Sequence, residues 1–456
     1  MKTILPPLLR SDPSWALFLA FAFLAGFSMP LARVALVASL VAALANKARR
    51  RSLRITGPTI GWLAYLALAL LVSGLVWAFD PDPLLRHASG FRKITKLLWF
   101  AAIPLAVVQV DSRPRLIATL QALVLGCSVT ALAVLVLNPL LAGFQLSYPT
   151  ETQMAAGTAS PFGETLYRAV SSLHLQESVN AWIYDCGRRT TFEGVLIKLG
   201  TMQSAQRLMV AIPAALCLFF ESRRSPKRSR AIQTILLLVL CFAALLLTYK
   251  RGPILAAGVV SIAILCSRLS WKRMILVLAA LAVVLTTAVA TVPPLRTRFS
   301  ELPTEFEIKK GGRAKMWTQI VPALHREHPY GVGFRALTWE KMFSLDRRKR
   351  VELAQNHVHS VPLQSFVDFG WAGLAVYLLW MVLGFRATGA LARCARVPAA
   401  DSSLPETACF MAPLAMFAAL VFYGFVEYNL ADSEVVLLYG LVLGLTSPSL
   451  RHSAAG

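Results

Sequence analysis

Residues 232–266 read IQTILLLVLCFAALLLTYKRGPILAAGVVSIAILC. Two apolar runs, 232–248 and 253–266, flank the only charged residues of this stretch, Lys250 and Arg251. Each run has the composition of a membrane-spanning helix, although the second is short for a full crossing. The stretch therefore predicts a helical hairpin in a membrane, with two cations in the turn between its helices.

The turn itself has the features of an anion site. Pro253 is favoured in the first turn of a helix, which places Lys250, Arg251 and Gly252 at the N-terminus of the second helix. Unpaired N–H groups and the helix dipole favour a negative charge there. Because a guanidinium binds phosphate oxygens in pairs, we expect this turn to bind a pyrophosphate.

The composition indicates a polytopic membrane protein. Of 456 residues, 56% are hydrophobic and only 15% are charged, where a soluble protein carries about a quarter charged residues. The net charge of +23 raises the alternative of nucleic-acid binding. However, the basic residues cluster in short loops beside apolar segments, which is the pattern of cytoplasmic loops. Six of the seven cysteines fall in predicted helices or cytoplasmic loops, so no disulfide framework is expected.

Hydropathy predicts an all-α polytopic membrane protein with about 12 transmembrane helices. The expected spans are 14–29, 31–46, 59–79, 94–110, 115–137, 200–220, 231–248, 253–267, 272–291, 361–384, 407–426 and 432–447. The first is interpreted as an uncleaved helix rather than a signal peptide, because a second apolar segment follows at once. Strict alternation places five Lys/Arg-rich loops on one side, which we take as the cytoplasm together with both termini.

This topology divides the chain into three parts. Residues 1–291 carry transmembrane helices 1–9 with a periplasmic loop near 138–199, and residues 361–456 carry helices 10–12. Residues 292–360 form a long, partly helical periplasmic loop that carries candidate catalytic residues. The loop is basic although it lies outside, which suits an anionic lipid or glycolipid, and long loops cross the membrane largely regardless of charge.

The long loop contains a predicted amphipathic helix that begins near Arg313. Trp317, Ile320, Val321 and Leu324 follow at helical spacing. Arg313 stands beside two glycines and is a better candidate anion ligand than the run 347–350, which we interpret as a solvated or headgroup-binding patch. For Trp317 two interpretations stay open, an interfacial anchor and a contact to a sugar.

Histidines concentrate on the outer side, and His359 is the best candidate for a general base. It lies where the outer loop enters the tenth span, at membrane level. The alternative is a zinc site formed by four histidines, His325, His328, His357 and His359. Their spacing is loose and no cysteine or HExxH pattern accompanies them, so no metal is expected.

Four segments in the second half resemble, in order, the motifs of the O-antigen ligase family, polytopic enzymes that share a fold with O-antigen polymerases. They are Thr248-Tyr-Lys-Arg251-Gly252 (T-x-S-R-G), Arg313-Ala-Lys-Met-Trp317 (R-x-x-x-W), His328-Pro-Tyr-Gly331-Val-Gly333-Phe334 (H-P-x-G-x-G-F), and His359-Ser-Val-Pro-Leu363-Gln364 with Asp368-Phe-Gly370-Trp-Ala-Gly373 (H-N-x-x-L-Q…E-x-G-x-x-G).

The chain departs from these motifs at two positions. Lys250 stands where serine is usual, and Ser360 stands where asparagine is usual. The pair Asn356-His357 therefore competes for the histidine role, but the spacing to Gln364 and Gly370 selects His359. The first half matches only in hydropathy and in a run around Arg189, which loosely resembles a family arginine before the sixth span.

The resemblance implies a glycosyltransferase that moves O-antigen glycan from undecaprenyl pyrophosphate to lipid A-core at the periplasmic face of the bacterial inner membrane, in lipopolysaccharide biosynthesis. It implies a metal-independent reaction without a cofactor, and the absence of a nucleotide-binding motif agrees with a lipid-linked donor. The expected partners are the donor, the acceptor and membrane lipids, without nucleic acid. The expected catalytic residues are His359, Arg251 and Arg313. The expected substrate-binding residues are Lys250, Arg189, Lys96, Arg92, Trp317, Gly331 and Gly333.

Three other functions remain as alternatives. An O-antigen polymerase shares the donor but uses a second lipid-linked chain as acceptor, and a protein O-oligosaccharyltransferase uses a protein. A lipid or polysaccharide transporter would carry charges near mid-membrane, whereas the charges in this chain lie at helix ends and in outer loops. Interfacial snorkelling is an alternative explanation for Arg189, Arg92, Lys93 and Lys96.

Overall fold

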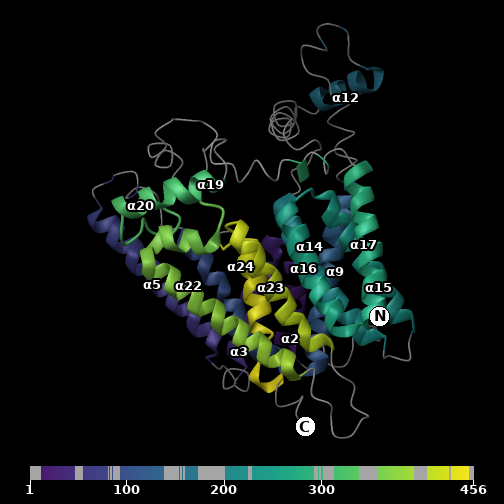
Figure 1. Ribbon diagram of the computed structural model, residues 1–456, viewed down its shortest axis with the longest axis horizontal. Helices are drawn as coiled ribbons and strands as arrows, with labels where there is room; N and C mark the ends of the chain where they lie inside the picture. Colours follow the sequence, from purple (N-terminus) through teal and green to yellow (C-terminus); the bar gives the residue numbers. More distant parts are fainter. Residues whose placement is uncertain are drawn as a thin grey trace.

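The computed structural model describes residues 12–46, 55–80, 82, 85, 93–137, 154, 157, 160–172, 201–223, 228–291, 296, 299–300, 313–337, 357–394, 408–430 and 433–450. Within these residues every regular element is a helix (Figure 1). The all-α prediction is confirmed for these residues.

The helices follow the predicted order along the chain. Those of the first half are α2 (Pro13–Ala25), α3 (Met29–Ala45), α5 (Gly57–Phe79), η1 (Thr95–Ala101), α8 (Ala102–Gln109), α9 (Arg113–Leu132), η2 (Ala133–Leu137), α12 (Pro161–Ser172) and α14 (Thr201–Ser222). Those of the second half are α15 (Arg228–Leu247), α16 (Arg251–Arg268), α17 (Trp271–Thr291), α19 (Arg313–Lys315), η5 (Met316–Ile320), α20 (Val321–Glu327), α22 (Val361–Cys394), η7 (Ala408–Met411), α23 (Ala412–Val426) and α24 (Ser433–Gly444).

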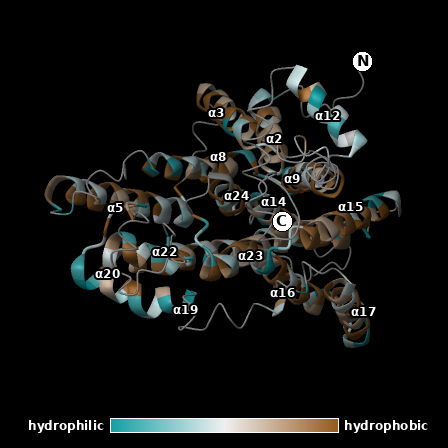
Figure 2. Cartoon of the chain, turned by 90° about the horizontal axis from the view of Figure 1, so that it is seen from above, coloured by the Kyte–Doolittle hydropathy of each residue, from teal (hydrophilic) through white to brown (hydrophobic). Residues whose placement is uncertain are grey.

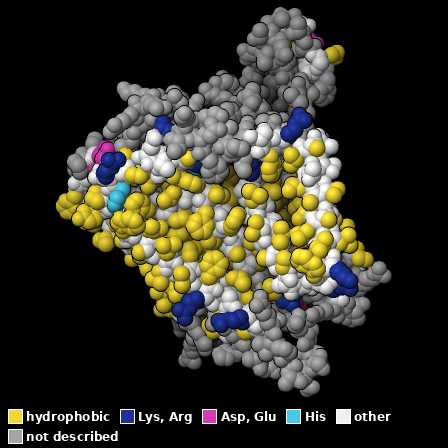
Figure 3. Space-filling view, viewed as in Figure 1, with side chains coloured by type: hydrophobic (Ala, Val, Ile, Leu, Met, Phe, Trp, Pro, Cys, Tyr) yellow, Lys and Arg dark blue, Asp and Glu magenta, His cyan; other side chains and the backbone are white. Residues whose placement is uncertain are grey.

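Eight of the described helical segments are long and apolar enough to cross a membrane, which indicates a multi-pass membrane protein. Four shorter apolar helices occupy the other predicted spans: Pro13–Ala25, Met29–Ala45, Thr95–Gln109 and Val435–Gly444. The count of twelve crossings therefore stays a prediction. Figure 3 shows a broad hydrophobic face with Lys and Arg at its edges. The helix α17 has no buried residue, and its apolar side chains face outward as expected for contact with lipid.

The tenth predicted span differs from its prediction in two ways. The helix α22 continues to Cys394 instead of ending near 384, and it is broken at Phe369 and Gly370. Gly370 has φ +63°, and a Cβ atom there would lie 2.6 Å from the carbonyl oxygen of Pro329. The break is therefore set by a tertiary contact with the outer loop, which hydropathy does not detect.

The outer loop docks on this break through backbone hydrogen bonds. Val332 N donates to Val367 O at 3.0 Å, and Gly333 N donates to Asp368 O at 2.9 Å. Gly331 has φ +93°, and a Cβ atom there would lie 2.4 Å from Asp368 O. Two glycine-containing segments far apart in the sequence thus interlock, and the described outer loop is fixed to a membrane helix.

The predicted turn before the eighth span also has a defined neighbour. The helix α16 begins at Arg251 with Lys250 as its N-cap residue, as predicted. A Cβ atom on Gly252 would lie 2.7 Å from the ring of Tyr423 in α23. This close approach brings the Lys250–Arg251 turn to the C-terminal part of α23, one helical turn before Glu427.

We predict that Gly331→Ala lowers the stability of the folded protein, by roughly 1–3 kcal/mol, because the new Cβ atom clashes with backbone and the positive φ is strained. Thermal unfolding in detergent measures the effect. Gly258→Ala is the matched control, since nothing lies within 4 Å of its Cβ position in α16 and alanine favours a helix. Equal thermal stability of the two variants would contradict the proposed docking.

Candidate active site

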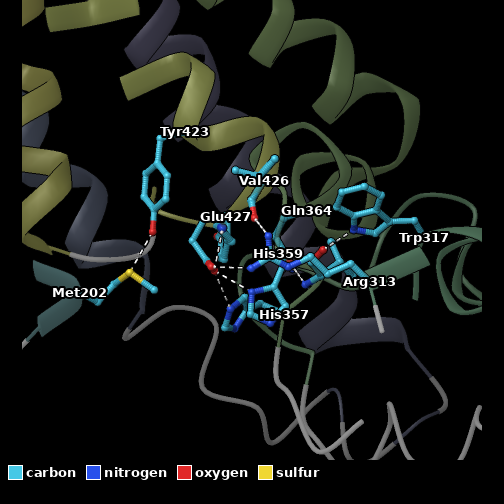
Figure 4. Close-up of polar contacts among 11 residues, drawn as sticks. Met202, Arg313, Trp317, His357, His359, Gln364, Tyr423, Val426 and Glu427 are labelled. Atoms are coloured by element: carbon cyan, nitrogen blue, oxygen red, sulfur yellow. Dashed lines mark hydrogen bonds and ion pairs between the residues drawn. The ribbon is translucent and has the colours of Figure 1, made fainter. Parts of the chain in front are cut away.

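The centre of the site is Glu427, which directly follows the last residue of α23. Its side chain is only 9% exposed. Its Oε1 atom lies 2.7 Å from His359 Nδ1 and 3.4 Å from His357 Nε2 (Figure 4). A buried carboxylate needs such partners, because removing the charge from water is costly unless it is paired.

A cation completes the surroundings of this carboxylate. Arg313, the first residue of α19, donates from Nη1 to the carbonyl oxygen of Val426 at 2.5 Å. Its Nη2 atom lies 3.4 Å from Oε2 of Glu427. The structure therefore brings together two predicted catalytic residues, Arg313 and His359, around a carboxylate that the sequence analysis did not select.

The backbone around His359 is held from both sides. Trp317 Nε1 donates to Val358 O at 2.7 Å, and Val358 N donates to Gln364 Oε1 at 2.9 Å. Gln364 Nε2 in turn donates to Asp368 Oδ1 at 2.7 Å. These bonds hold His359 at φ +49°, a left-handed conformation that is strained for a non-glycine residue. Its position and ring direction are thus imposed by the fold.

The electrostatics favour an ionised glutamate and a neutral histidine. Burial lowers the pKa of His359, and His357 and Arg313 lower it further, against the raising effect of Glu427. Burial alone would raise the pKa of Glu427, but hydrogen bonds from the two histidines and the charge of Arg313 hold that pKa well below its usual range. With Nδ1 of His359 donating to the carboxylate, Nε2 carries the lone pair, as in a general base with an orienting acid.

One ligand atom each of His357, His359 and Glu427 lies within 4.8 Å of the others, so these three residues have the donor set for a metal ion. The four-histidine site considered from the sequence is not formed. His325 packs its ring on Phe366 at 4.6 Å, and His328 Nδ1 lies 3.1 Å from Asp80 Oδ2.

The other predicted site residues lie in several different places. Lys250 and Arg251 lie at the start of α16, and Trp317 is engaged with the backbone beside His359. Gly331 and Gly333 both have positive φ, which favours glycine, and Gly331 also lies too close to Asp368 for a Cβ atom. Their contact with substrate stays a prediction. Lys96 lies in a separate groove between α3, α5 and η1. Arg92, Arg189 and the run 347–350 lie outside the described residues.

Comparison with known families agrees with the motifs. Residues 236–378 match the O-antigen ligase family. This confirms the resemblance, since the matched segment contains the Lys250–Arg251 turn, Arg313, the docking glycines and His359. The match supports a glycosyl-transfer function of the O-antigen ligase or polymerase type in lipopolysaccharide biosynthesis. Among curated proteins no match to the chain was found.

Glu427 lies outside the segment that matches the O-antigen ligase family and was missed in the sequence analysis. The available signal was its position, because it is an acidic residue at the C-terminal end of the apolar span 407–426. Charged residues at membrane level usually have a function or a partner. A search for carboxylates at span ends would have selected it, but only the structure shows its pairing with His359.

We predict that Glu427→Gln slows glycosyl transfer by about 10²-fold or more, because the base loses its orienting partner. Glu427 raises the pKa of His359, so its removal should move the acidic limb of the pH–rate profile to lower pH. The measurement is kcat/KM against pH for wild type and variant. If Glu427→Gln changes neither kcat/KM nor the pH of the acidic limb of the profile, Glu427 does not act on His359.

Proposed function

We propose that this protein is an O-antigen ligase that transfers glycan from undecaprenyl pyrophosphate to a sugar hydroxyl of lipid A-core at the periplasmic face of the inner membrane. The observation that carries the proposal is the His359–Glu427 hydrogen bond at 2.7 Å, next to Arg313 and at the end of a membrane helix. A base at membrane level suits a reaction between two lipid-anchored substrates.

In the proposed reaction His359 Nε2 accepts the proton of the acceptor hydroxyl as its oxygen attacks the anomeric carbon of the donor glycan. The new glycosidic bond forms while the bond from that carbon to the pyrophosphate oxygen breaks. Undecaprenyl pyrophosphate leaves with both electrons of the broken bond. The proton stays on His359, where the ionised Glu427 stabilises the imidazolium.

The departing pyrophosphate needs cations, and the site supplies them from two segments. Arg251 and Lys250 lie at the N-terminus of α16, where the helix dipole adds to their charge. Arg313 lies beside the base. Matched charge at the leaving group is worth several powers of ten in rate in comparable reactions.

We further propose that the reaction does not use a metal. Arg313 already stands 3.4 Å from Oε2 of Glu427, and Oε1 is shared by two histidines. A divalent cation bound to Glu427 would be repelled by the adjacent Arg313 guanidinium. It would also occupy the carboxylate that stabilises protonated His359. Transfer should therefore persist in the presence of a chelator.

The second candidate is an O-antigen polymerase, because the family match supports both activities. The reacting centre would be the same, and only the acceptor would differ. Incubation of purified protein with lipid-linked oligosaccharide, with and without lipid A-core, separates the two. A glycan on lipid A-core supports the ligase, and a longer lipid-linked glycan formed without it supports the polymerase.

We predict that His359→Ala abolishes transfer while binding of the lipid-linked donor is kept, because the base is lost and the cations remain. His325→Ala is the matched control, since its ring packs on Phe366 and Trp371 away from Glu427. The assay is product formation with and without a chelator. If the chelator stops the wild type and zinc restores it, the metal-free mechanism is wrong.

A further inference from the structure

A groove lies between α3, α5 and η1, separate from the site around Glu427. Its volume is about 910 Å³. Three cations line it, one near the start of α3, one just before η1 and one in the first turn of η1. They are Arg33, Lys93 and Lys96. The remaining lining is mostly apolar and consists of Leu36, Val37, Leu40, Trp62, Thr95, Leu98, Trp99 and Ala101.

Arg33 is the groove cation whose surroundings leave its charge without a carboxylate among the described residues. Its guanidinium lies over the ring of Trp99, 5.0 Å from the centroid. Within the described residues it contacts no carboxylate, and its Nε atom is buried without a hydrogen-bond partner. An arginine in the second turn of an apolar membrane helix is costly unless an anion compensates its charge. A ligand that brings its own negative charge would do so.

The apolar part of the groove runs along α3 below this charge. Leu36, Val37 and Leu40 follow Arg33 at spacings of three, four and seven residues, which keeps them on one face of the helix. Leu98 of η1 lies across from them. A cationic end followed by an apolar track suits a lipid whose head carries a phosphate, since the phosphate and the chain then each meet a matching surface.

The groove is connected to the candidate site through Arg335. Lys93 Nζ donates to Arg335 O at 2.7 Å. The Arg335 guanidinium lies 6.0 Å from the ring centroid of Tyr428, and that ring lies 5.9 Å from the ring of His357. Arg335 and Tyr428 thus stand between the groove and the histidines. A phosphate in the groove would therefore lie near the candidate site without contacting His357 or His359.

We propose that this groove binds a lipid phosphate of the acceptor, a phosphorylated glycolipid. The proposal rests on the proposed function. The donor phosphate is attached to the reacting carbon and must lie beside His359, whereas core sugars separate the acceptor phosphates from the accepting hydroxyl. Figure 2 places α3 and α5 on one side of α23 and α24, and α16 with its own cations on the other. The two lipids would therefore approach the base from opposite sides. Lys96, which the sequence analysis expects to bind substrate, is thereby assigned to the acceptor together with Lys93.

The experiment measures KM separately for donor and acceptor in Arg33→Gln, Lys96→Gln and Arg33→Lys. The matched control is Arg326→Gln, an exposed arginine on α20 whose Nε donates to Pro322 O in its own helix. The acceptor is used both intact and after removal of its lipid phosphates by a phosphatase. Each glutamine variant should raise the KM for intact acceptor about tenfold and leave the KM for donor unchanged. Arg33→Lys should keep most of the affinity.

With the dephosphorylated acceptor, wild type and glutamine variants should have the same KM. A higher KM for the donor would overturn the proposal and assign the groove to the donor lipid. Unchanged KM values for both substrates, or an equal effect on the dephosphorylated acceptor, would also overturn it. If the transfer rate of the glutamine variants falls below that of wild type only when phosphatidylglycerol vesicles are added, the proposal is overturned and the groove is assigned to bulk lipid. If the wild type forms no product with the intact acceptor, the proposed function itself fails. That result is distinguishable from a failure of the groove proposal, in which the wild type is active.

Discussion

The arrangement of the site depends on one constraint, a carboxylate buried at the end of a membrane helix. Glu427 cannot remain ionised there without compensation, because the cost of desolvating a lone charge is several kcal/mol. Partners from two separate segments meet this need: Arg313 at the start of α19, and His357 with His359 just before α22. The same contacts that satisfy the charge also fix the direction of the His359 imidazole, which is the geometry that the proposed general base requires. The contacts that pair the buried charge of Glu427 are therefore also the contacts that hold His359 in place.

A second feature keeps this arrangement in place. The break in α22 at Phe369 and Gly370 frees the carbonyl groups of Val367 and Asp368, and the N–H groups of Val332 and Gly333 donate to them. Gln364 and Asp368, just before the break, extend the network to the backbone of Val358 and Arg335. The network thus fixes Val358, which precedes His359, and Arg335, whose carbonyl oxygen accepts a hydrogen bond from Lys93 in the α3–α5 groove. Rigid support of this kind is what a catalytic base requires, because small displacements cost large factors in rate.

The sequence was sufficient for the helical class and for the positions of most apolar helices, and it selected four candidate site residues whose roles stay predictions. Lys250 and Arg251 were identifiable because charges between two apolar runs are rare, and Arg313 and His359 because short motifs surround them. Glu427 was open to selection by its place at a span end, but its pairing with His359 was not, since that depends on tertiary packing across 68 residues. The break at Gly370 was missed for the same reason, because hydropathy is continuous across it. Arg33 stands in an ordinary apolar helix, and only its position opposite Lys93 and Lys96 gives it a role.

The central claim is that Glu427 acts on the reaction through His359. A double-mutant cycle on the rate of glycan transfer tests it most directly, with His359→Ala, Glu427→Gln and the double variant compared under saturating donor and acceptor. If Glu427 acts through the imidazole, Glu427→Gln adds no further loss once His359 is gone, so the double variant matches His359→Ala. If the two losses multiply, Glu427 acts independently of the base, and the coupling of carboxylate and imidazole proposed for this site is contradicted.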